Sequence, residues 1–460
     1  MAFGLFLGGW PRAFCATSLA ILATGAVIGG AVAQPAADPA APAPNTTVTA
    51  AAAPATTLAA VSGNPAATTF STGTGWLGRT LGIPDEWGIK LGGLWLADTN
   101  LVAAGGVQPG GWTSNSALFG SLTIDAEKLV NWRGASFGAA ILQLNGANTN
   151  GEAGSVTGYN GIVGHTPFQR TELYEAWYLQ EIVKDVLQVR VGKVASGLDF
   201  DNVLRPVIFT GPDADKNIPS VSGLLYSTVF TNGTLIGALP GYYNTAYGVT
   251  VNFTPTKSFY LNVGSYDGNG ARNTVQTGLS PPLFNGYYFN IAEIGVNWTL
   301  GAERKPGQFG IGLWRQTGLL TVTGTNITQD GTGGVYIFGS QQIASHVNDR
   351  VPNSSISAFY QFGASNSQTL PVNQYYGAGL TGFGLIGDRA LDSMGAGISL
   401  SRLNQNIFAR ASEIILQAYY QAHVYGATFL QPTVSYIPSP GTSATAPGAL
   451  MLTMRLTVLF

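Results

Sequence analysis

The C-terminal stretch Leu450-Met-Leu-Thr-Met-Arg-Leu-Thr-Val-Leu-Phe460 decides the fold class of this chain. Positions 450, 452, 454, 456, 458 and 460 are all apolar, whereas Thr453, Arg455 and Thr457 lie between them. A period of two indicates a β-strand with one apolar and one more polar face. A strand of about ten residues is also long enough to cross a bilayer when tilted. The segment therefore predicts a membrane-spanning strand.

The same alternation recurs along the chain from Trp87 onward, about sixteen times in all. A soluble β-sandwich alternates too, but it gives no reason for an apolar face without charge in every strand. Short turns and long polar loops alternate as the connections between these segments. The predicted long loops are 98–116, 145–170, 195–246, 267–289 and 317–334. We therefore predict an all-β fold, a transmembrane antiparallel β-barrel of about 16 strands with short periplasmic turns and long extracellular loops.

The composition agrees with a membrane barrel. Only 10% of the residues are charged, against about 25% in an ordinary soluble domain. No stretch after residue 33 offers eighteen consecutive apolar residues, so the sequence predicts no transmembrane helix. A closed sheet is then the way to satisfy the backbone in lipid. The net charge of −2 gives no reason to expect nucleic-acid binding.

The N-terminal part of the chain differs from the rest. Arg12 precedes an apolar run that ends in Ala31-Val-Ala33, a small-x-small cleavage site. We interpret residues 1–33 as a signal peptide rather than a membrane anchor, because no basic stop follows the apolar run. Residues 34–75 are rich in Ala, Pro and Thr, which predicts a disordered linker. The barrel is expected to span 76–460.

Three further segments carry a family resemblance. They are Gln188–Phe200 (QVRVGKVASGLDF), Gly377–Arg389 (GAGLTGFGLIGDR) and Leu430–Gly441 (LQPTVSYIPSPG). Together they resemble the carbohydrate-selective porin (OprB-like) family, in order along the chain from about Trp76 to the end. The resemblance implies a sixteen-stranded channel that favours monosaccharides and has an eyelet of charged and aromatic residues. The long loop 195–246, which would normally narrow such a pore, matches the family poorly.

The predicted function is passive diffusion of small hydrophilic solutes across the bacterial outer membrane, favouring carbohydrates such as monosaccharides. A general non-selective porin is the alternative. An outer-membrane hydrolase and a surface β-sandwich adhesin are two further classes. The three histidines lack metal-ligand spacing, and the single cysteine, Cys15, lies in the predicted signal peptide. We expect no enzyme activity, catalytic residue, metal or cofactor, although a catalytic triad is a spatial arrangement that sequence alone does not exclude.

Strand parity selects candidate pore residues. If Val189 and Val191 face lipid, Arg190 between them faces the lumen, and we expect Glu175 to pair with it. A neutral sugar needs hydrogen-bonding groups and an aromatic face. The predicted eyelet residues are Arg190, Glu175, Trp177, Glu293, Trp314, Glu413, Arg455 and Lys90 on strands, with Asp199, Asp201 and Arg205 in the long loop. Alternatively, the charges only solvate the wall, and the two tryptophans belong to an interfacial girdle.

The chain is expected to have several partners. They are outer-membrane lipid and small neutral sugars. The chain is also expected to bind further copies of itself in a homotrimer. The terminal strand ending in Phe460 resembles the signal read by the outer-membrane assembly machinery. We therefore expect Phe460 to direct insertion.

Overall fold

A computed structural model describes residues 75–460, except 202, 204–222, 242–243 and 273–276. The predicted signal peptide and nearly all of the predicted linker lie outside the described residues. Arg205 lies outside them as well. None of the helices among the described residues is long and apolar enough to cross a membrane.

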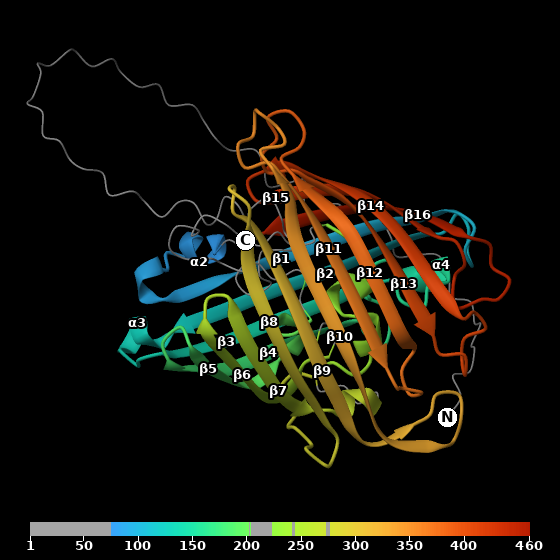
Figure 1. The fold of residues 1–460 in the computed structure, drawn as a ribbon, viewed down its shortest axis with the longest axis horizontal. Helices are drawn as coiled ribbons and strands as arrows, with labels where there is room; N and C mark the ends of the chain where they lie inside the picture. The colour runs from blue at the N-terminus through green and yellow to red at the C-terminus, as the bar shows by residue number, and fades with distance from the viewer. Residues whose placement is uncertain (1–74, 202, 204–222, 242–243, 273–276) are drawn as a thin grey trace, which may run out of the picture. The chain divides into compact units, whose positions relative to one another are not determined.

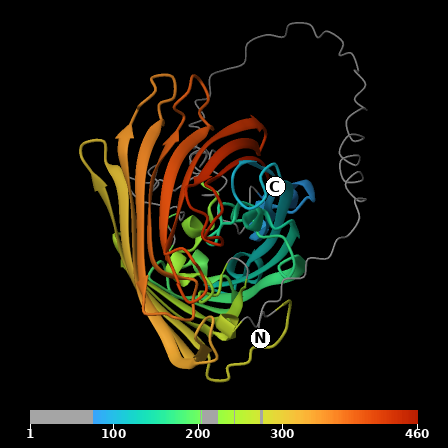
Figure 2. The same ribbon diagram turned by 90° about the vertical axis from the view of Figure 1, so that its right-hand side faces the viewer.

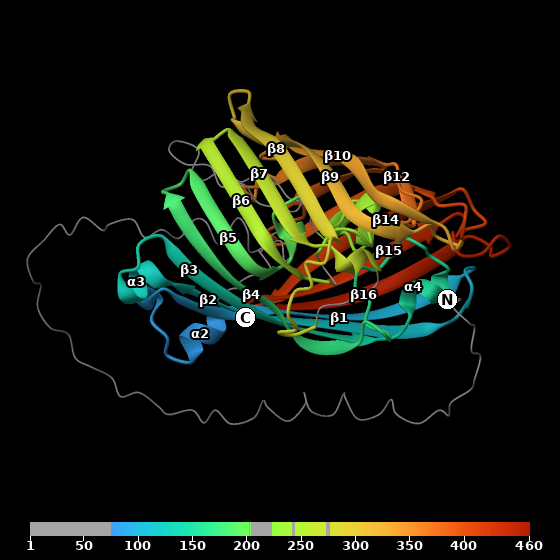
Figure 3. The ribbon, with the colours of Figure 1, turned by 90° about the horizontal axis from the view of Figure 1, so that it is seen from below.

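Sixteen antiparallel strands close into one barrel, in which each strand pairs with its sequence neighbour and β1 pairs with β16 (Figure 1). The predicted fold class is confirmed. The strands are β1 Ile89–Ala104, β2 Trp112–Asp125, β3 Ala135–Gly146, β4 Arg170–Val183, β5 Leu187–Val194, β6 Ala246–Thr256, β7 Phe259–Asp267, β8 Tyr288–Leu300, β9 Lys305–Thr321, β10 Thr328–Ser345, β11 Ser355–Ser365, β12 Val372–Phe383, β13 Ser393–Leu403, β14 Ser412–Tyr425, β15 Thr428–Ile437 and β16 Ala449–Leu459. Figure 3 shows β5 to β9 side by side in chain order.

Short helices occur only between or before strands in the described part of the chain. They are α2 Trp76–Thr80, η1 Asp85–Trp87, α3 Ala126–Val130, α4 Thr149–Ala153, η2 Ser196–Leu198, α5 Ser227–Phe230, η4 Gly233–Leu235 and η5 Asn269–Arg272. In α3, the Asp125 carboxylate caps the first turn by accepting from the backbone N–H groups of Glu127 and Lys128. A capped single turn is therefore enough to connect β2 to β3.

The two faces of the terminal strand differ as the alternation predicts. Leu452 and Met454 on β16 are 42% and 43% exposed, whereas Thr453 and Arg455 are 4% and 6% exposed. The exposed apolar side chains point away from the barrel interior. They form part of the outer surface that lipid solvates in a membrane barrel.

Two strands begin or end beyond their predicted limits. β1 runs to Ala104 and β9 to Thr321, so the connections after them shrink to residues 105–111 and 322–327. The sequence prediction of longer loops was wrong in β1 because Asp98 and Asn100 face inward in mid-strand and are polar. Because these two residues are polar, the segment was assigned to a loop and not to a strand.

Two long connections fold back inside the barrel, where their short helices lie within the ring of strands (Figure 2). One is the β3–β4 loop, residues 147–169, and the other is the described part of the β5–β6 loop, residues 195–245. The second loop reaches the far wall. Asn232 Nδ2 donates to the Phe362 carbonyl of β11 over 3.0 Å, and Gln431 Nε2 of β15 donates to the Gly223 carbonyl over 2.6 Å.

The apolar core of the molecule therefore lies inside the lumen. Apolar side chains of the β5–β6 loop pack against inward-facing aromatic residues of the wall. They are Leu224, Tyr226, Val229 and Leu235 from the loop, with Phe289, Trp314, Tyr336, Phe359 and Tyr419 from the strands. Burial of these groups holds the loop in place without covalent links.

Candidate functional site: the eyelet

An ion pair on one wall forms the centre of the candidate eyelet. Arg190 of β5 points into the lumen, and its guanidinium donates to the carboxylate of Asp199, just after η2. The Arg190 Cζ atom lies 5.8 Å from the centroid of the Trp177 ring on β4. The side chains of Arg190 and Asp199 remain 14% and 12% exposed. Three predicted residues thus meet at one place.

Neighbouring polar groups fix the position of Asp199. Asn262 Nδ2 of β7 donates to the Asp199 backbone carbonyl over 3.0 Å. Thr250 Oγ1 of β6 lies 3.4 Å from the Asp199 carboxylate and 2.6 Å from the hydroxyl of Tyr266. Sequence reasoning missed Thr250 on β6, the strand next to β5, and Asn262 and Tyr266 on β7, the strand after it. For an uncharged polar residue, strand parity is the strongest sequence evidence that it faces the lumen, and parity alone does not identify a site residue.

The expected pairing of Glu175 with Arg190 was wrong as a direct contact. Glu175 is buried, and its Oε1 accepts from the backbone N–H of Ala195 over 2.8 Å, where the β5–β6 loop begins. The register of β3 and β4 shifts at Ala140/Ile141, which leaves Tyr174 as an extra residue in β4. Such a bulge changes strand parity locally, here before Glu175, so Glu175 and Trp177 still share the inward face that their parity predicted.

Asp201, two residues after Asp199 in the loop, contacts Glu293 of β8. Glu293 Oε2 of β8 accepts from the Asp201 backbone N–H and from the Tyr336 hydroxyl, each over 2.7 Å. The Asp201 carboxylate in turn accepts from the Asn232 N–H over 2.7 Å. Burial raises the pKa of Asp201 well above its usual range; the Asn232 N–H opposes this rise and the nearby Glu293 charge adds to it. Glu293 therefore attaches the loop to β8, and Asp201 links two parts of the same loop.

Glu413 of β14 holds the other inward loop. Its carboxylate accepts from the Ser155 hydroxyl and the Val156 N–H over 2.9 Å. It also accepts from the N–H and hydroxyl of Thr157 and from the Gly441 N–H, over 2.7 to 2.9 Å. Glu413 is 1% exposed. The structure thus places this predicted eyelet residue under the loop, with its oxygens already bonded to protein groups.

Arg455 closes the seam of the barrel. Its Nε and Nη2 atoms donate to the two carboxylate oxygens of Asp98 on β1, each over 2.7 Å. Asn160 of the β3–β4 loop donates to the same carboxylate over 2.8 Å. Sequence reasoning selected Arg455 but placed Asp98 at the start of a loop. A fork-to-fork pair between the first and last strands is a strong, directional contact.

The remaining candidates lie apart from the ion pair. Trp314 is buried among the lumen aromatics and stacks on Phe289 with ring centroids 6.0 Å apart, so it is not a girdle residue. Lys90 is exposed near the start of β1, at the turn side of the barrel. No group of three or more His, Cys, Asp or Glu among the described residues could hold a metal ion.

Apart from the exposed Lys90, the predicted charges that the structure describes fall into two groups by their accessibility. Glu175, Asp201, Glu293, Glu413 and Arg455 are all buried by loops or partners. Arg190 and Asp199 keep part of their surface open. Such a neutral pair of opposite charges, with an aromatic ring beside it, offers donors, acceptors and an apolar face to a polyol.

Comparison with known proteins extends this result. The sequence pattern of the carbohydrate-selective porin, OprB family, matches residues 113–460. Porin B of Pseudomonas aeruginosa is 23% identical over 399 residues, which are 77% of this chain and 83% of that protein.

Solved structures give the same fold. The high-pH structure of Pseudomonas putida OprB aligns with a TM-score of 0.70 at 18% identity and covers 85% of this chain and 99% of that one. The low-pH structure of the same protein aligns with a TM-score of 0.52 at 16% identity and covers 85% and 100%. The family match runs from β2 to the C-terminus. The chain therefore belongs to the carbohydrate-selective porin family, and it is a channel of the bacterial outer membrane that favours sugars.

Proposed function

We propose that the Arg190–Asp199 pair, set beside Trp177, is the element by which this channel favours neutral sugars. The observation that carries the proposal is their partial exposure, because the predicted charges Glu175, Asp201, Glu293, Glu413 and Arg455 are buried. The proposed transport is passive diffusion without a catalytic step.

The chemistry of the pair suits an uncharged solute. Arg190 presents five donors in a rigid fork, and Asp199 uses only some of them. Asp199 neutralises the charge, so an anion gains little by entering. The Trp177 ring supports the guanidinium at 5.8 Å. A sugar can therefore exchange bound water for hydrogen bonds at low cost, which a small ion cannot do.

Replacement of the arginine tests the proposal. Arg190→Ala should leave the barrel folded, and its ion conductance should stay level or rise because the eyelet widens. Inhibition of that current by glucose in planar bilayers should weaken by about 1–3 kcal/mol, the value of one or two charge-assisted hydrogen bonds. Arg190→Lys keeps the charge without the fork and should weaken it as well.

Lys90→Ala serves as the matched control, because Lys90 is an exposed cation away from the ion pair. It should behave like the parent protein. Equal inhibition of the parent and Arg190→Ala by glucose would mean that Arg190 is only part of the wall, and the general-porin alternative would gain.

Two assembly properties are proposed on separate grounds. The apolar face of β16 and the pairing of Phe460 with Gly93, through hydrogen bonds of 2.9 and 3.0 Å, support Phe460 as the signal for the assembly machinery. A homotrimer is the predicted oligomeric state. Light scattering of the protein in detergent tests it, and a monomer mass would contradict it.

A further inference from the structure

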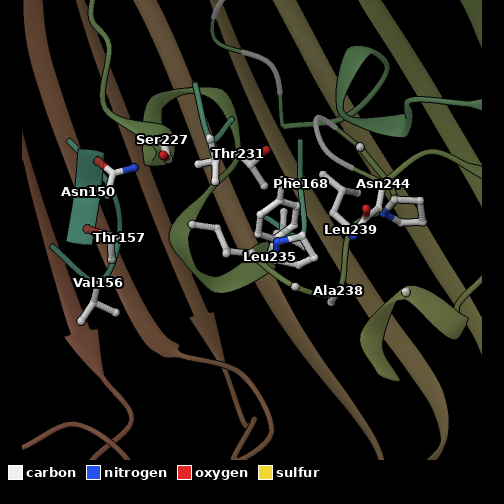
Figure 4. A pocket seen from close by; sticks show the side chains of 18 of the residues that line it. Asn150, Val156, Thr157, Phe168, Ser227, Thr231, Leu235, Ala238, Leu239 and Asn244 are labelled. Atoms are coloured by element: carbon white, nitrogen blue, oxygen red, sulfur yellow. The ribbon is translucent and has the colours of Figure 1, made fainter. Parts of the chain in front are cut away.

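A cavity of about 580 Å³ lies between the two inward loops, on the side of the barrel where the long connections are. Its lining includes Asn150 and Thr157 from the β3–β4 loop and Ser227, Thr231 and Asn244 from the β5–β6 loop (Figure 4). Pockets of roughly 300–1,000 Å³ are the usual size for small-molecule sites. The cavity is therefore large enough for a compact organic solute.

Hydrogen bonds between the two loops build its wall. Gly161 N–H donates to the Leu225 carbonyl over 2.6 Å, and Ser227 N–H donates to the Gly158 carbonyl over 2.8 Å. Glu413 fixes the segment 155–157 to β14. The site is thus formed before any solute arrives, which lowers the entropic cost of binding.

The described residues of the lining offer no available charge. The one carboxylate among them, that of Asp267, already accepts from the side chain and N–H of Asn269 and from the N–H groups of Leu283 and Phe284. Burial lowers the pKa of His165, which favours the neutral form of its imidazole. An ion would lose water here without gaining a partner.

Polar and apolar groups both line the cavity. Ser227 and Thr231 bring hydroxyl groups, and Asn244 brings a side-chain amide. Phe168 and Leu235 bring apolar surface (Figure 4). Hydroxyl-rich, uncharged solutes with apolar C–H faces match this combination.

We propose that this cavity is a second saccharide site, which binds a neutral sugar of one or two units on the extracellular side of the eyelet. The inference rests on the proposed function, because it supplies the sugar that passes on to Arg190 and Asp199. A site before the constriction would raise the local sugar concentration there.

The test uses the whole protein in planar bilayers with maltose or glucose added to one side at a time. The double variant Ser227→Ala/Thr231→Val should weaken maltose block from the loop side about tenfold, as expected when two hydrogen bonds are lost. Phe168→Ala should weaken it as well. Glucose block from the turn side and ion conductance should stay at parent values. Thr445→Val, an exposed loop threonine outside the lining, is the matched control.

Heat-modifiable migration confirms that each variant is folded. Maltose block of both cavity variants equal to that of the parent would overturn the second site. Loss of glucose block in Arg190→Ala, with loop-side maltose block retained, supports two separate sites. Unaltered glucose block in Arg190→Ala together with weakened maltose block in the cavity variants would overturn the eyelet proposal and leave the second site standing.

Discussion

The buried glutamate carboxylates in this lumen accept hydrogen bonds from inward-folding segments of the chain and are not open to water in the pore. Glu175, Glu293 and Glu413 each accept backbone N–H groups from a segment that folds inward. Parity predicted that Glu293 and Glu413 face inward, and it also predicted the facing of Arg190. It could not show which inward charges a loop would cover. The path of a loop depends on contacts between residues far apart in sequence.

Loss of the charge at Glu413 should loosen the β3–β4 loop. In Glu413→Gln, one carboxylate oxygen is replaced by an NH2 group, which cannot accept from the donors of residues 155–157 and 441. Leaving those donors unpaired should cost about 1–3 kcal/mol. We expect faster proteolysis within 147–169 and a noisier current, whereas Glu303→Gln on an exposed turn should change neither. Parent-like protection of the loop would contradict the anchoring role.

At the scale of single strands, the period of two was a sufficient guide wherever the inner face is polar and the outer face apolar. It failed in the polar middle of β1, where Asp98 and Asn100 were assigned to a loop. Alternation reports facing only while the strand stays regular and its inner face differs from a loop in composition.

Facing on β5 gives a direct test of the alternation. Val191 is 49% exposed on the lipid side, so Val191→Arg should destabilise the barrel by about 2–4 kcal/mol if it lies near mid-membrane. Gln188→Arg on the inner face of the same strand should fold, because Glu181 lies close enough to pair with it. Unfolding by urea in lipid vesicles measures both. Equal tolerance would mean that the facing is reversed.

The last residue of the chain gives a second test. Phe460 pairs with Gly93 through two backbone hydrogen bonds and so extends the seam by one residue. Deletion of Phe460 should lower the amount of membrane-inserted protein and raise periplasmic degradation. Quantitative blots of outer-membrane fractions measure this. Normal insertion would show that the assembly machinery does not need the residue.

For the whole molecule, the sequence predicted a closed barrel, and the family resemblance implied that the 195–246 loop narrows the pore, but no sequence feature indicated that the β3–β4 loop also folds into the lumen. The first and last strands meet at Asp98 and Arg455, residues separated by almost the whole barrel sequence. Asn160 attaches an inward loop to this pair. Closure of the barrel and placement of the loop thus share one buried contact.

Removal of one member of this pair should be costly. Arg455→Leu leaves Asp98 buried without its counter-ion, and such losses cost about 3–5 kcal/mol. The double variant Asp98→Asn/Arg455→Leu removes both charges and should recover much of that stability. The temperature at which the folded band disappears on unboiled gels measures both. Equal losses in the single and double variants would contradict the pairing account.

The most direct test of the central claim is a glucose titration of the ion current through the unmodified protein in planar bilayers. Glycerol solutions of matched viscosity give the reference. A channel with a sugar site at Arg190 and Asp199 should show a saturable loss of current with glucose beyond the loss with glycerol. Identical, unsaturable declines in the two solutes would contradict the account and indicate a general pore.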